Sequence, residues 1–210
     1  MTRSEEQAGA LAERIEGLGA EVVLCPLIRT EPLGDATVDV VAYDWVVVTS
    51  PNGAAELARR LEGSPRRLAA IGPGTAAALR ERGLEPDLVP ATSTQEGLLA
   101  ELPDPPGRVL LAAAEGARRL LADELGADFL ALYRTIELVP EEPPDGDLVV
   151  LSSPSAARAF ARTGARIAAV AIGPQTAGEA RALGLDVVAE AETHDLDGLA
   201  AAVERALATR

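Results

Sequence analysis

An internal repeat constrains this chain more than any other feature of its sequence. The stretch "IGPGTAAALRERGLEPDLVP" that begins at Ile71 returns as "IGPQTAGEARALGLDVVAEA" at Ile172, and the two align without a gap. Both copies carry Gly-Pro-x-Thr, as Gly72 to Thr75 and Gly173 to Thr176. Each copy reads as a strand, a turn and a helix. Either the turn is only a good way to begin a helix, or two such turns face one ligand.

The repeat extends well beyond this pair of segments. "VVVTSPNGAAELARR" at 46–60 matches "VVLSSPSAARAFART" at 149–163, which places Ser50-Pro51 over Ser153-Pro154. Two further segments, "EEQAGALAERIEGLGAEV" and "EGARRLLADELGADF", are also similar, and both run into a strand that ends in Arg-Thr. The chain therefore holds two half-units, at 1–30 and 45–102, and then both again at 108–135 and 148–207.

Short apolar runs alternate with helical patterns along the chain. Strands are predicted at 22–28, 45–50, 67–72, 108–113, 128–134, 148–153 and 167–173, and helices at 54–61, 76–82, 118–125, 156–162 and 177–183. Strands that alternate with helices favour parallel sheets wound by right-handed crossovers. The many Ala, Val, Leu and Ile residues suit a buried parallel sheet covered by helices. The sequence therefore predicts an α/β protein.

Two similar connectors, "LIRTEPLG" and "LYRTIELVPEEPPDG", lie between the repeated units. Both have β-like sequences, and the second ends in a Pro-rich segment of the kind found at domain boundaries. If the chain crosses between domains at both connectors, its middle forms one domain and its two ends form the other. We expect a discontinuous first domain at 1–33 and 138–210, a second domain at 36–132, and connector strands at 28–35 and 133–138.

The composition excludes several classes of function. The chain has no lysine, which removes a phosphate-loop lysine, a Schiff-base lysine and an anchor for pyridoxal phosphate. One His and one Cys cannot build a zinc site from those ligands. His194 precedes a predicted helix, where it would either cap the helix or meet solvent rather than act in catalysis. The composition therefore argues against a zinc site and against pyridoxal phosphate as a cofactor.

Charge and cysteine content bear on partners and location. The net charge of −14 argues against nucleic acid or an anionic membrane as a partner. No apolar run approaches the roughly 20 residues of a membrane span. The single cysteine, Cys25, excludes an internal disulfide and fits a reducing compartment. We expect a cytoplasmic, soluble monomer.

The four repeated turns carry the candidate chemistry. Ser50 and Ser153 suit the N-cap position of a helix, and the proline that follows each gives up only an N–H that was unpaired anyway. The other free N–H groups and the positive end of the helix dipole point out at the carboxyl edge of the sheet, where ligands of open α/β sheets bind. We expect the two Ser-Pro and two Gly-Pro-x-Thr turns to line a shared cleft that accepts anions.

Taken together in their order, these motifs resemble those of the uroporphyrinogen-III synthase family. The resemblance rests on "VVVTSPNGA", "AIGPGTAAALRERGLEPDLVP", "TQEGLLAEL", "LYRT", "LSSPSAA" and "AIGPQTAGEARALGLDV", and covers essentially the whole chain. It implies two flavodoxin-like α/β domains with parallel sheets, joined by a two-stranded β connector. It also implies an enzyme of haem and porphyrin biosynthesis, a lyase that closes the linear tetrapyrrole hydroxymethylbilane to uroporphyrinogen III without a cofactor. The last pyrrole ring is inverted on the way.

The resemblance also assigns roles to residues. The reaction begins with loss of the substrate's terminal hydroxyl, and the resemblance places Tyr133 as the proton donor to that group. The alternative is that Tyr133 is a packing aromatic of the connector, and the other copy has Ile28 at the equivalent place. The expected substrate contacts are the residues of the repeated turns: Ser50, Asn52, Gly72, Thr75, Ser153, Ser155, Gly173 and Thr176. A non-catalytic two-domain protein that closes on a small anionic ligand is the other function that these turns allow.

The two copies differ at the start of the chain. The later copy has "RVLLAA" ahead of its "EGARRLL" helix, whereas the first copy begins at "MTRSEEQ". We hypothesise that the native start lies upstream of Met1 and that several apolar residues are missing, which would leave the first domain's sheet interrupted. An in-frame stop codon directly before Met1 in the upstream DNA would exclude this.

Overall fold

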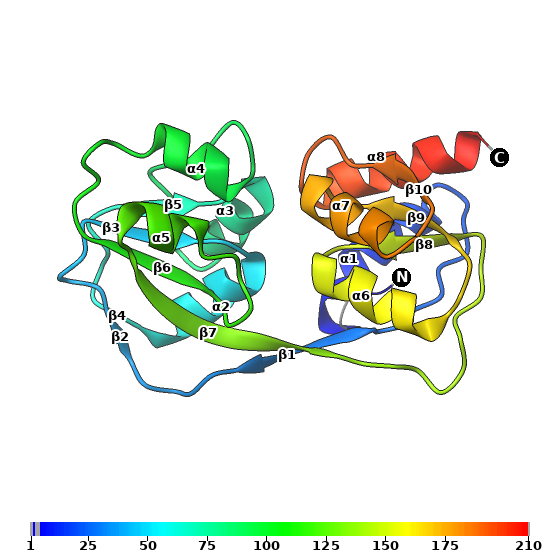
Figure 1. Ribbon diagram of the computed structural model, residues 1–210, viewed down its shortest axis with the longest axis horizontal. Helices are drawn as coiled ribbons and strands as arrows, with labels where there is room; N and C mark the ends of the chain where they lie inside the picture. The colour runs from blue at the N-terminus through cyan, green and yellow to red at the C-terminus, as the bar shows by residue number, and fades with distance from the viewer. Residues whose placement is uncertain (1, 3–4, 210) are drawn as a thin grey trace. The chain divides into compact units, whose positions relative to one another are not determined.

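A computed structural model describes Thr2 and residues 5–209, and for residues 5–8 it describes the backbone alone. The chain divides into two compact units. One, the terminal unit, consists of Met1–Arg29 and Ile136–Arg210, and the other, the middle unit, is Thr30–Thr135. Each unit contains a parallel sheet with helices around it (Figure 1), so the predicted α/β class is confirmed.

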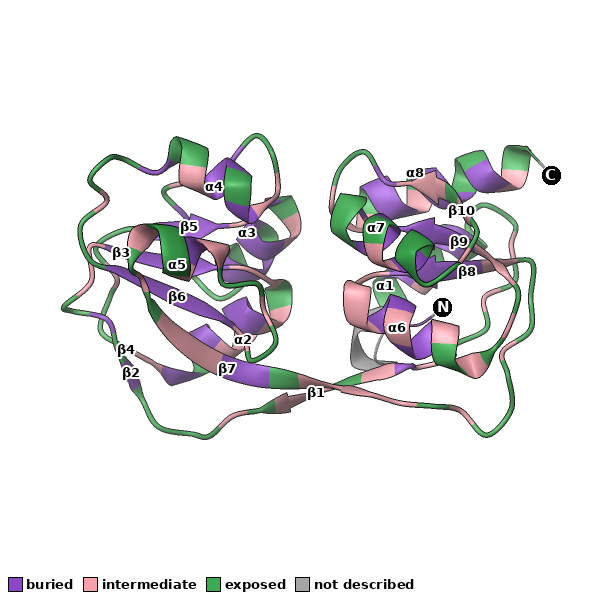
Figure 2. Cartoon of the chain, viewed as in Figure 1, coloured by how far each residue is buried: buried purple, intermediate pink, exposed green. Residues whose placement is uncertain are grey.

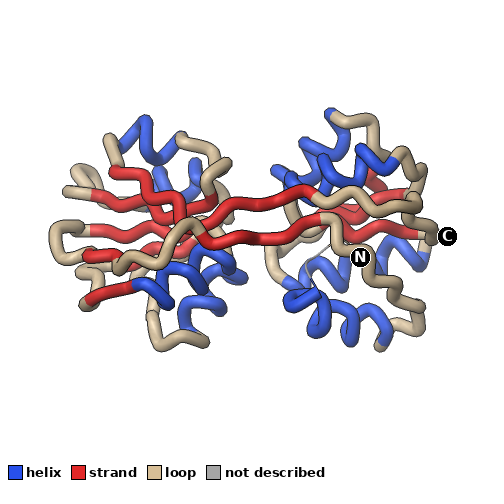
Figure 3. Tube along the Cα trace, turned by 90° about the horizontal axis from the view of Figure 1, so that it is seen from below, coloured by secondary structure: helices blue, strands red, loops and turns tan. Residues whose placement is uncertain are grey.

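The sheet of the middle unit has five strands, in the order β1-β7-β6-β3-β5. Neighbours β7 and β6, β6 and β3, and β3 and β5 are parallel. Figure 3 shows β1 and β7 side by side as a long pair of strands. The bounds are Ile28–Pro32 for β1, Trp45–Val48 for β3, Leu68–Ala70 for β5, Val109–Ala114 for β6 and Asp128–Glu137 for β7. A small parallel pair, β2 (Val38–Asp39) and β4 (Leu61–Glu62), lies apart from this sheet.

Helices cover both faces of the middle sheet. On β3, alternate side chains point to opposite faces: Val46 and Val48 belong to one apolar cluster, and Trp45 and Val47 to the other. The first cluster includes side chains of α2 (Pro51–Arg60) and α3 (Pro73–Arg80), and the second those of α4 (Gln95–Glu101) and α5 (Leu120–Leu125). A strand that is buried on both faces explains why 45–48 is an unbroken apolar run.

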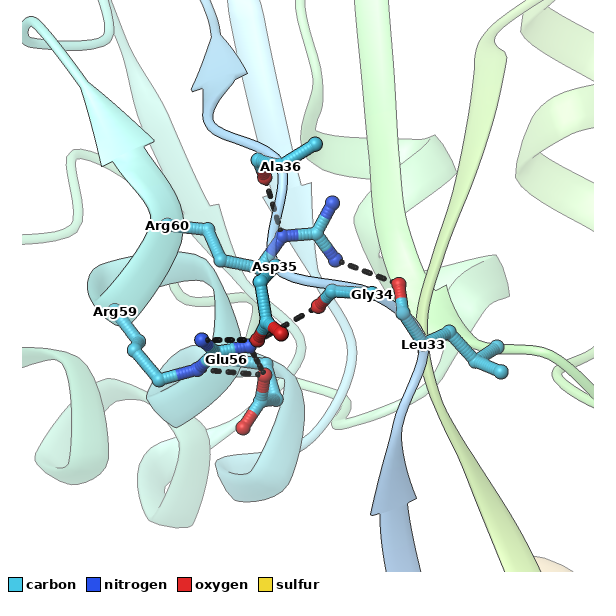
Figure 4. Close-up of polar contacts among 7 residues, drawn as sticks. All are labelled: Leu33, Gly34, Asp35, Ala36, Glu56, Arg59 and Arg60. Carbon is cyan, nitrogen blue, oxygen red and sulfur yellow. Dashed lines mark hydrogen bonds and ion pairs between the residues drawn. The ribbon is translucent and has the colours of Figure 1, made fainter.

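Two arginines fix the segment that follows β1 to the end of α2 (Figure 4). Arg60, which is buried, donates to the carbonyls of Ala36 and Leu33. Arg59 pairs with Asp35 and with Glu56 on its own helix. Both arginines lie in the last turn of α2, where positive charge interacts favourably with the helix dipole.

The terminal unit has a sheet of three parallel strands, in the order β10-β9-β8. The bounds are Leu148–Leu151 for β8, Ala168–Ala171 for β9 and Val187–Glu190 for β10. On one face pack α1 (Glu5–Glu16) and α8 (Leu196–Ala208), and on the other α6 (Pro154–Thr163) and α7 (Pro174–Ala182). The strands β8 and β9 are almost entirely buried between these layers (Figure 2).

The predicted strands and helices form with shifts at their ends, with one exception. Each repeated helix begins at its proline, which is two or three residues earlier than the apolar pattern predicted. The reason is that the residue before each proline takes the N-cap position: Ser50, Gly72, Ser153 and Gly173. The strand predicted at 22–28 is wrong: only Ile28 lies in a strand. In the middle unit the corresponding strand, β7, pairs with β6, whereas 22–27 has no such strand beside it among the described residues.

The described part of the chain contains no helix that combines the length and the apolarity needed to cross a lipid bilayer.

Candidate active site

The carboxyl end of β3 brings two of the expected residues together. Ser50 is the N-cap of α2, and its Oγ accepts a hydrogen bond from the backbone N–H of Gly53 at 2.9 Å. The same Oγ lies 2.9 Å from Oη of Tyr133, which comes from β7. Either hydroxyl can donate in that contact. The pair therefore links the start of α2 to β7.

Tyr133 lies in an apolar environment with a polar tip. It is only 6 % exposed and belongs to the cluster that contains Val48, Ala112 and Leu132. Burial raises the pKa of its hydroxyl above the ordinary 10.0, and hydrogen bonds with Ser50 and Asn52 oppose that rise. The phenol is therefore protonated at neutral pH, so it can donate a proton but cannot act as a general base.

The second turn of the middle unit differs from the first because no side chain caps its helix. Gly72 is the N-cap of α3, and the helix lacks a side-chain cap hydrogen bond. Thr75, in the first turn, is 3 % exposed. Within the described residues its hydroxyl makes no hydrogen bond. The start of α3 therefore has free N–H groups and a hydroxyl that a ligand could use.

The Ser-Pro turn of the terminal unit repeats the serine cap. Ser153 Oγ accepts from the N–H of Ala156 at 3.1 Å, as Ser50 does for Gly53. Ser155 is already in an internal contact, because its Oγ accepts from Arg158 at 3.1 Å. Arg158 also pairs with Glu137 and Glu179. A substrate that used Ser155 would have to share it with this network.

The Gly-Pro turn of the terminal unit begins a helix without a side-chain cap, as the Gly-Pro turn of the middle unit does. Gly173 is the N-cap of α7 without a side-chain cap, and Thr176 is 2 % exposed. As with Thr75, the described residues offer no hydrogen bond to the Thr176 hydroxyl. The four expected contacts of this unit thus lie at the starts of α6 and α7, at the carboxyl ends of β8 and β9.

Ser93, which the sequence analysis missed, and His194, which it placed outside the site, lie against Gly72 and Gly173. A Cβ added to Gly72 would lie 2.5 Å from Oγ of Ser93, and one added to Gly173 would lie 2.7 Å from Cδ2 of His194. The repeat aligns Ser93 with His194, and this equivalence in the sequence could have identified both residues. His194 is not a helix cap, because Asp195 caps α8 by accepting from the N–H of Gly198 at 2.8 Å. The glycines thus allow close approach of a neighbouring loop.

A cavity of about 540 Å³ lies elsewhere in the middle unit. It is lined by Trp45, Arg67 and Gly107 among others, at the amino ends of β3, β5 and β6. The candidate turns lie at the opposite, carboxyl ends of these strands. Over the described part of the chain, no His, Cys, Asp and Glu side chains gather into a group that could hold a metal ion.

The chain is similar in sequence to proteins of one family. The chain is 29 % identical over 147 residues to a putative uroporphyrinogen-III synthase of Methanocaldococcus jannaschii, covering 65 % of this chain but only 61 % of that protein. It is 27 % identical to the uroporphyrinogen-III synthase of Synechococcus elongatus, covering 97 % of this chain and 93 % of the other.

Among solved structures, a mutant uroporphyrinogen III synthase of Thermus thermophilus has the same fold, with a TM-score of 0.64 at 20 % identity and coverage of 99 % of this chain and 97 % of that one. Residues 9–201 match the family model described as uroporphyrinogen-III synthase HemD. The chain belongs to the uroporphyrinogen-III synthase family.

Proposed function

We propose that this protein is a uroporphyrinogen-III synthase, which closes hydroxymethylbilane to uroporphyrinogen III with inversion of the last pyrrole ring and loss of water. The observation that supports this best is the Tyr133 hydroxyl, protonated and held 2.9 Å from Ser50 at the start of α2, in a chain of this family. The relatives named above carry that activity in their names.

Tyr133 donates its proton to the substrate's terminal hydroxyl as the C–O bond breaks, so that water leaves and a reactive azafulvene remains in its protonated, cationic form beside the phenolate. A positioned proton donor accelerates such a step by about a hundredfold to ten-thousandfold. Burial makes the phenolate costly, so the phenol recovers a proton once ring closure releases one from the pyrrole carbon. Ser50 fixes the direction of the Tyr133 hydroxyl through their shared hydrogen bond.

The substrate is held by many weak contacts rather than by a covalent bond to the protein. The expected contacts lie at the starts of α2 and α3 in the middle unit, and of α6 and α7 in the terminal unit. The uncapped starts of α3 and α7, with the buried hydroxyls of Thr75 and Thr176, offer the most free donors to substrate carboxylates. Local donors matter because the protein's net charge of −14 repels an anionic substrate at long range, and screening over about 8 Å limits that repulsion.

We infer further that the two compact units are the two predicted domains, with boundaries near 33, 36, 132 and 138. We also infer that the protein acts as a cytoplasmic monomer without nucleic acid or membrane. Its acidic charge and single cysteine favour this. Light scattering of the purified protein tests the oligomeric state.

The test of function is incubation of the purified protein with hydroxymethylbilane, followed by separation of the uroporphyrinogen isomers. The substrate cyclises unaided to the type I isomer, so an excess of type III product over a protein-free control supports the enzyme. If only type I forms while the protein still binds the substrate, the protein is a binder of anionic ligands and the proposed activity is wrong.

A further inference from the structure

His194, the single histidine of the chain, makes no hydrogen bond or ion pair within the described residues. It caps no helix either, because the N-cap of α8 is the next residue, Asp195. Its side chain is half-buried. An imidazole carries at least one N–H donor in either protonation state. This donor is therefore available to a ligand.

The ring of His194 lies directly against the N-cap of α7. A Cβ built on Gly173 would lie 2.7 Å from Cδ2, 2.8 Å from Nε2 and 3.2 Å from Cγ of this ring. No side chain caps α7, Pro174 has no N–H, and the N–H of Ala177 donates to the carbonyl of Gly173. The backbone N–H groups of the two residues between, 175 and 176, make no hydrogen bond within the described residues. The imidazole thus lies beside two further free donors.

A buried hydroxyl in the same turn has no partner either. Thr176 is 2 % exposed, and among the described residues nothing accepts a hydrogen bond from its hydroxyl or donates to it. A buried hydroxyl that lacks a hydrogen-bond partner is destabilising, and a bound acceptor would remove that cost. Independently of His194, Thr176 therefore indicates a ligand at the start of α7.

The loop that carries His194 is held on both sides. Before it, the N–H of Ala191 donates to the last residue of β9 at 2.9 Å. After it, Oδ1 of Asp195 accepts from the N–H of Gly198 at 2.8 Å and from the hydroxyl of Thr193 at 3.1 Å. A Cβ on Gly198 would meet the carbonyl of Thr193, so the loop lies tightly against the start of α8. The position of His194 is therefore fixed before a ligand binds, which lowers the entropy that binding costs.

The acidic residues near His194 in the chain have partners of their own. Asp195 is the cap of α8, and Glu192 and Asp197 each pair with an arginine, at 3.6 Å and 2.7 Å. None of these carboxylates forms an ion pair with the imidazole within the described residues. A carboxylate of a ligand could therefore bind there without displacing one of the protein.

The middle unit has the same arrangement with a different side chain. The repeat aligns Ser93 with His194, and a Cβ on Gly72 would lie 2.5 Å from Oγ of Ser93. Among the described residues the Ser93 hydroxyl also makes no hydrogen bond, and Thr75 is 3 % exposed. Each unit thus has a polar side chain with a free donor beside a helix that begins at glycine without a side-chain cap. This fits a role for both side chains at the helix starts.

We propose that His194 is a substrate-binding residue, which donates an imidazole N–H to a carboxylate of the tetrapyrrole while the start of α7 binds the same group. The inference rests on the proposed function, because it takes the carboxylate from the proposed substrate. A carboxylate accepts up to about four hydrogen bonds, which is enough for the imidazole, the two free N–H groups and the Thr176 hydroxyl. His194 contributes affinity and position, and takes no part in breaking the C–O bond.

Two variants separate hydrogen-bond donation from packing. His194→Phe keeps a flat ring beside Gly173 and removes both nitrogens, whereas His194→Gln loses the ring and keeps an N–H donor. We expect the Phe variant to raise KM for hydroxymethylbilane by about tenfold with kcat within about twofold of wild type, because it loses a hydrogen bond to a charged group. The Gln variant should stay within about threefold of the wild-type KM. A packing role predicts the reverse order, and thermal melts of both variants verify that they fold.

The single histidine also allows a direct measurement of binding. In protein with isotopically labelled histidine and no polyhistidine tag, the Cε1–H group of His194 gives one NMR signal. The probe is uroporphyrinogen III, the proposed product, kept reduced under anaerobic conditions. We expect the signal to shift on addition of the probe and to saturate with the Kd that calorimetry measures. That Kd should be about tenfold higher for the Phe variant.

The outcomes distinguish this inference from the proposed function. If wild type forms type III product and the Phe variant keeps the wild-type KM and Kd, the proposed activity stands and the assignment of His194 is wrong, even where the signal shifts. An unshifted signal overturns the assignment as well. If wild type forms no type III product while the Phe variant still binds the probe about tenfold more weakly, His194 binds the tetrapyrrole and the proposed activity is wrong.

Discussion

At the scale of single residues, experiments have to distinguish two roles of Tyr133, packing in the core and proton donation. Its ring belongs to an apolar cluster, which is what a packing aromatic would show. Its hydroxyl, however, is directed to Ser50 and is kept protonated by burial, which is what a proton donor requires. Both properties belong to one side chain, so only variants that remove them one at a time can distinguish the roles.

Tyr133→Phe keeps the ring and removes the donor. We expect the rate of type III product formation to fall by about a hundredfold, or about 3 kcal/mol of barrier. Loss of the hydrogen bond with Ser50 should cost about 1 kcal/mol of stability, which lowers Tm by only a few degrees. Steady-state assays and thermal melts on the same preparation measure both effects.

Tyr133→Ala is the matched variant for packing, since it removes the ring as well. A packing role alone predicts that the Phe variant keeps nearly the full rate, while the Ala variant loses both stability and activity, with a stability cost of about 3–5 kcal/mol. A fully active Phe variant would therefore exclude Tyr133 as the acid.

The raised pKa of Tyr133 also predicts how stability depends on pH. The folded phenol holds its proton beyond the pH at which the unfolded one ionises, near 10.0. Its contribution is therefore fully present below pH 10 and is lost as pH rises from there toward the folded pKa. We expect wild type to lose up to about 1.4 kcal/mol per pH unit above pH 10 relative to Tyr133→Phe.

Urea unfolding of both proteins at pH 8 and at pH 11 measures this difference. Tyr43 and the arginines are common to both proteins, so their titration cancels. A difference that does not change between the two pH values would show that burial leaves the Tyr133 pKa at its ordinary value.

At the scale of elements, the repeated helix starts fall into two kinds. Ser50 and Ser153 each accept from an N–H of the first turn through Oγ, whereas α3 and α7 begin at glycine with no such cap. Neither glycine is needed for its backbone angles, since both are extended, with φ near 180°. The close approach of Ser93 and His194 explains the glycines instead.

A pair of alanine variants in and before α7 tests this explanation. Gly173→Ala forces a Cβ against the His194 ring, and we expect it to destabilise the protein by about 1–3 kcal/mol. Gly178→Ala, inside the same helix, meets nothing within 4 Å and should stabilise it by about 0.5–1 kcal/mol. Denaturant unfolding measures both, and a Gly173→Ala protein as stable as wild type would refute the role of close approach.

Most of the fold was predictable from local patterns because its strands are short apolar runs and the four repeated helices begin at proline. The strand at 22–28 was not, because a strand forms only beside a partner strand, and the described residues place no strand beside 22–27. In the site, the caps could be predicted from Ser-Pro alone. The contact of Ser50 with Tyr133 could not, because it depends on the order of β3, β6 and β7 in the sheet.

At the scale of the whole molecule, an acidic protein has to bind a substrate rich in carboxylates. The arginines of the chain are largely committed: Arg59, Arg118, Arg134 and Arg158, for example, each pair with a carboxylate of the protein. Backbone N–H groups and hydroxyls at helix starts are the remaining class of donor. This predicts that binding depends on small polar side chains in both units more than on surface arginines.

The double variant Thr75→Ala with Thr176→Ala tests this, because it removes one buried hydroxyl from each unit and leaves charge unchanged. We expect KM for hydroxymethylbilane to rise by about tenfold or more, since each lost hydrogen bond to a charged group is worth about 1.5 kcal/mol or more. Arg82→Ala is the control, because Arg82 lies on the surface and donates to Ala78 of its own segment. If the Arg82 change abolishes activity while the double threonine change does not, substrate binding rests on surface charge, and helix starts are not its source.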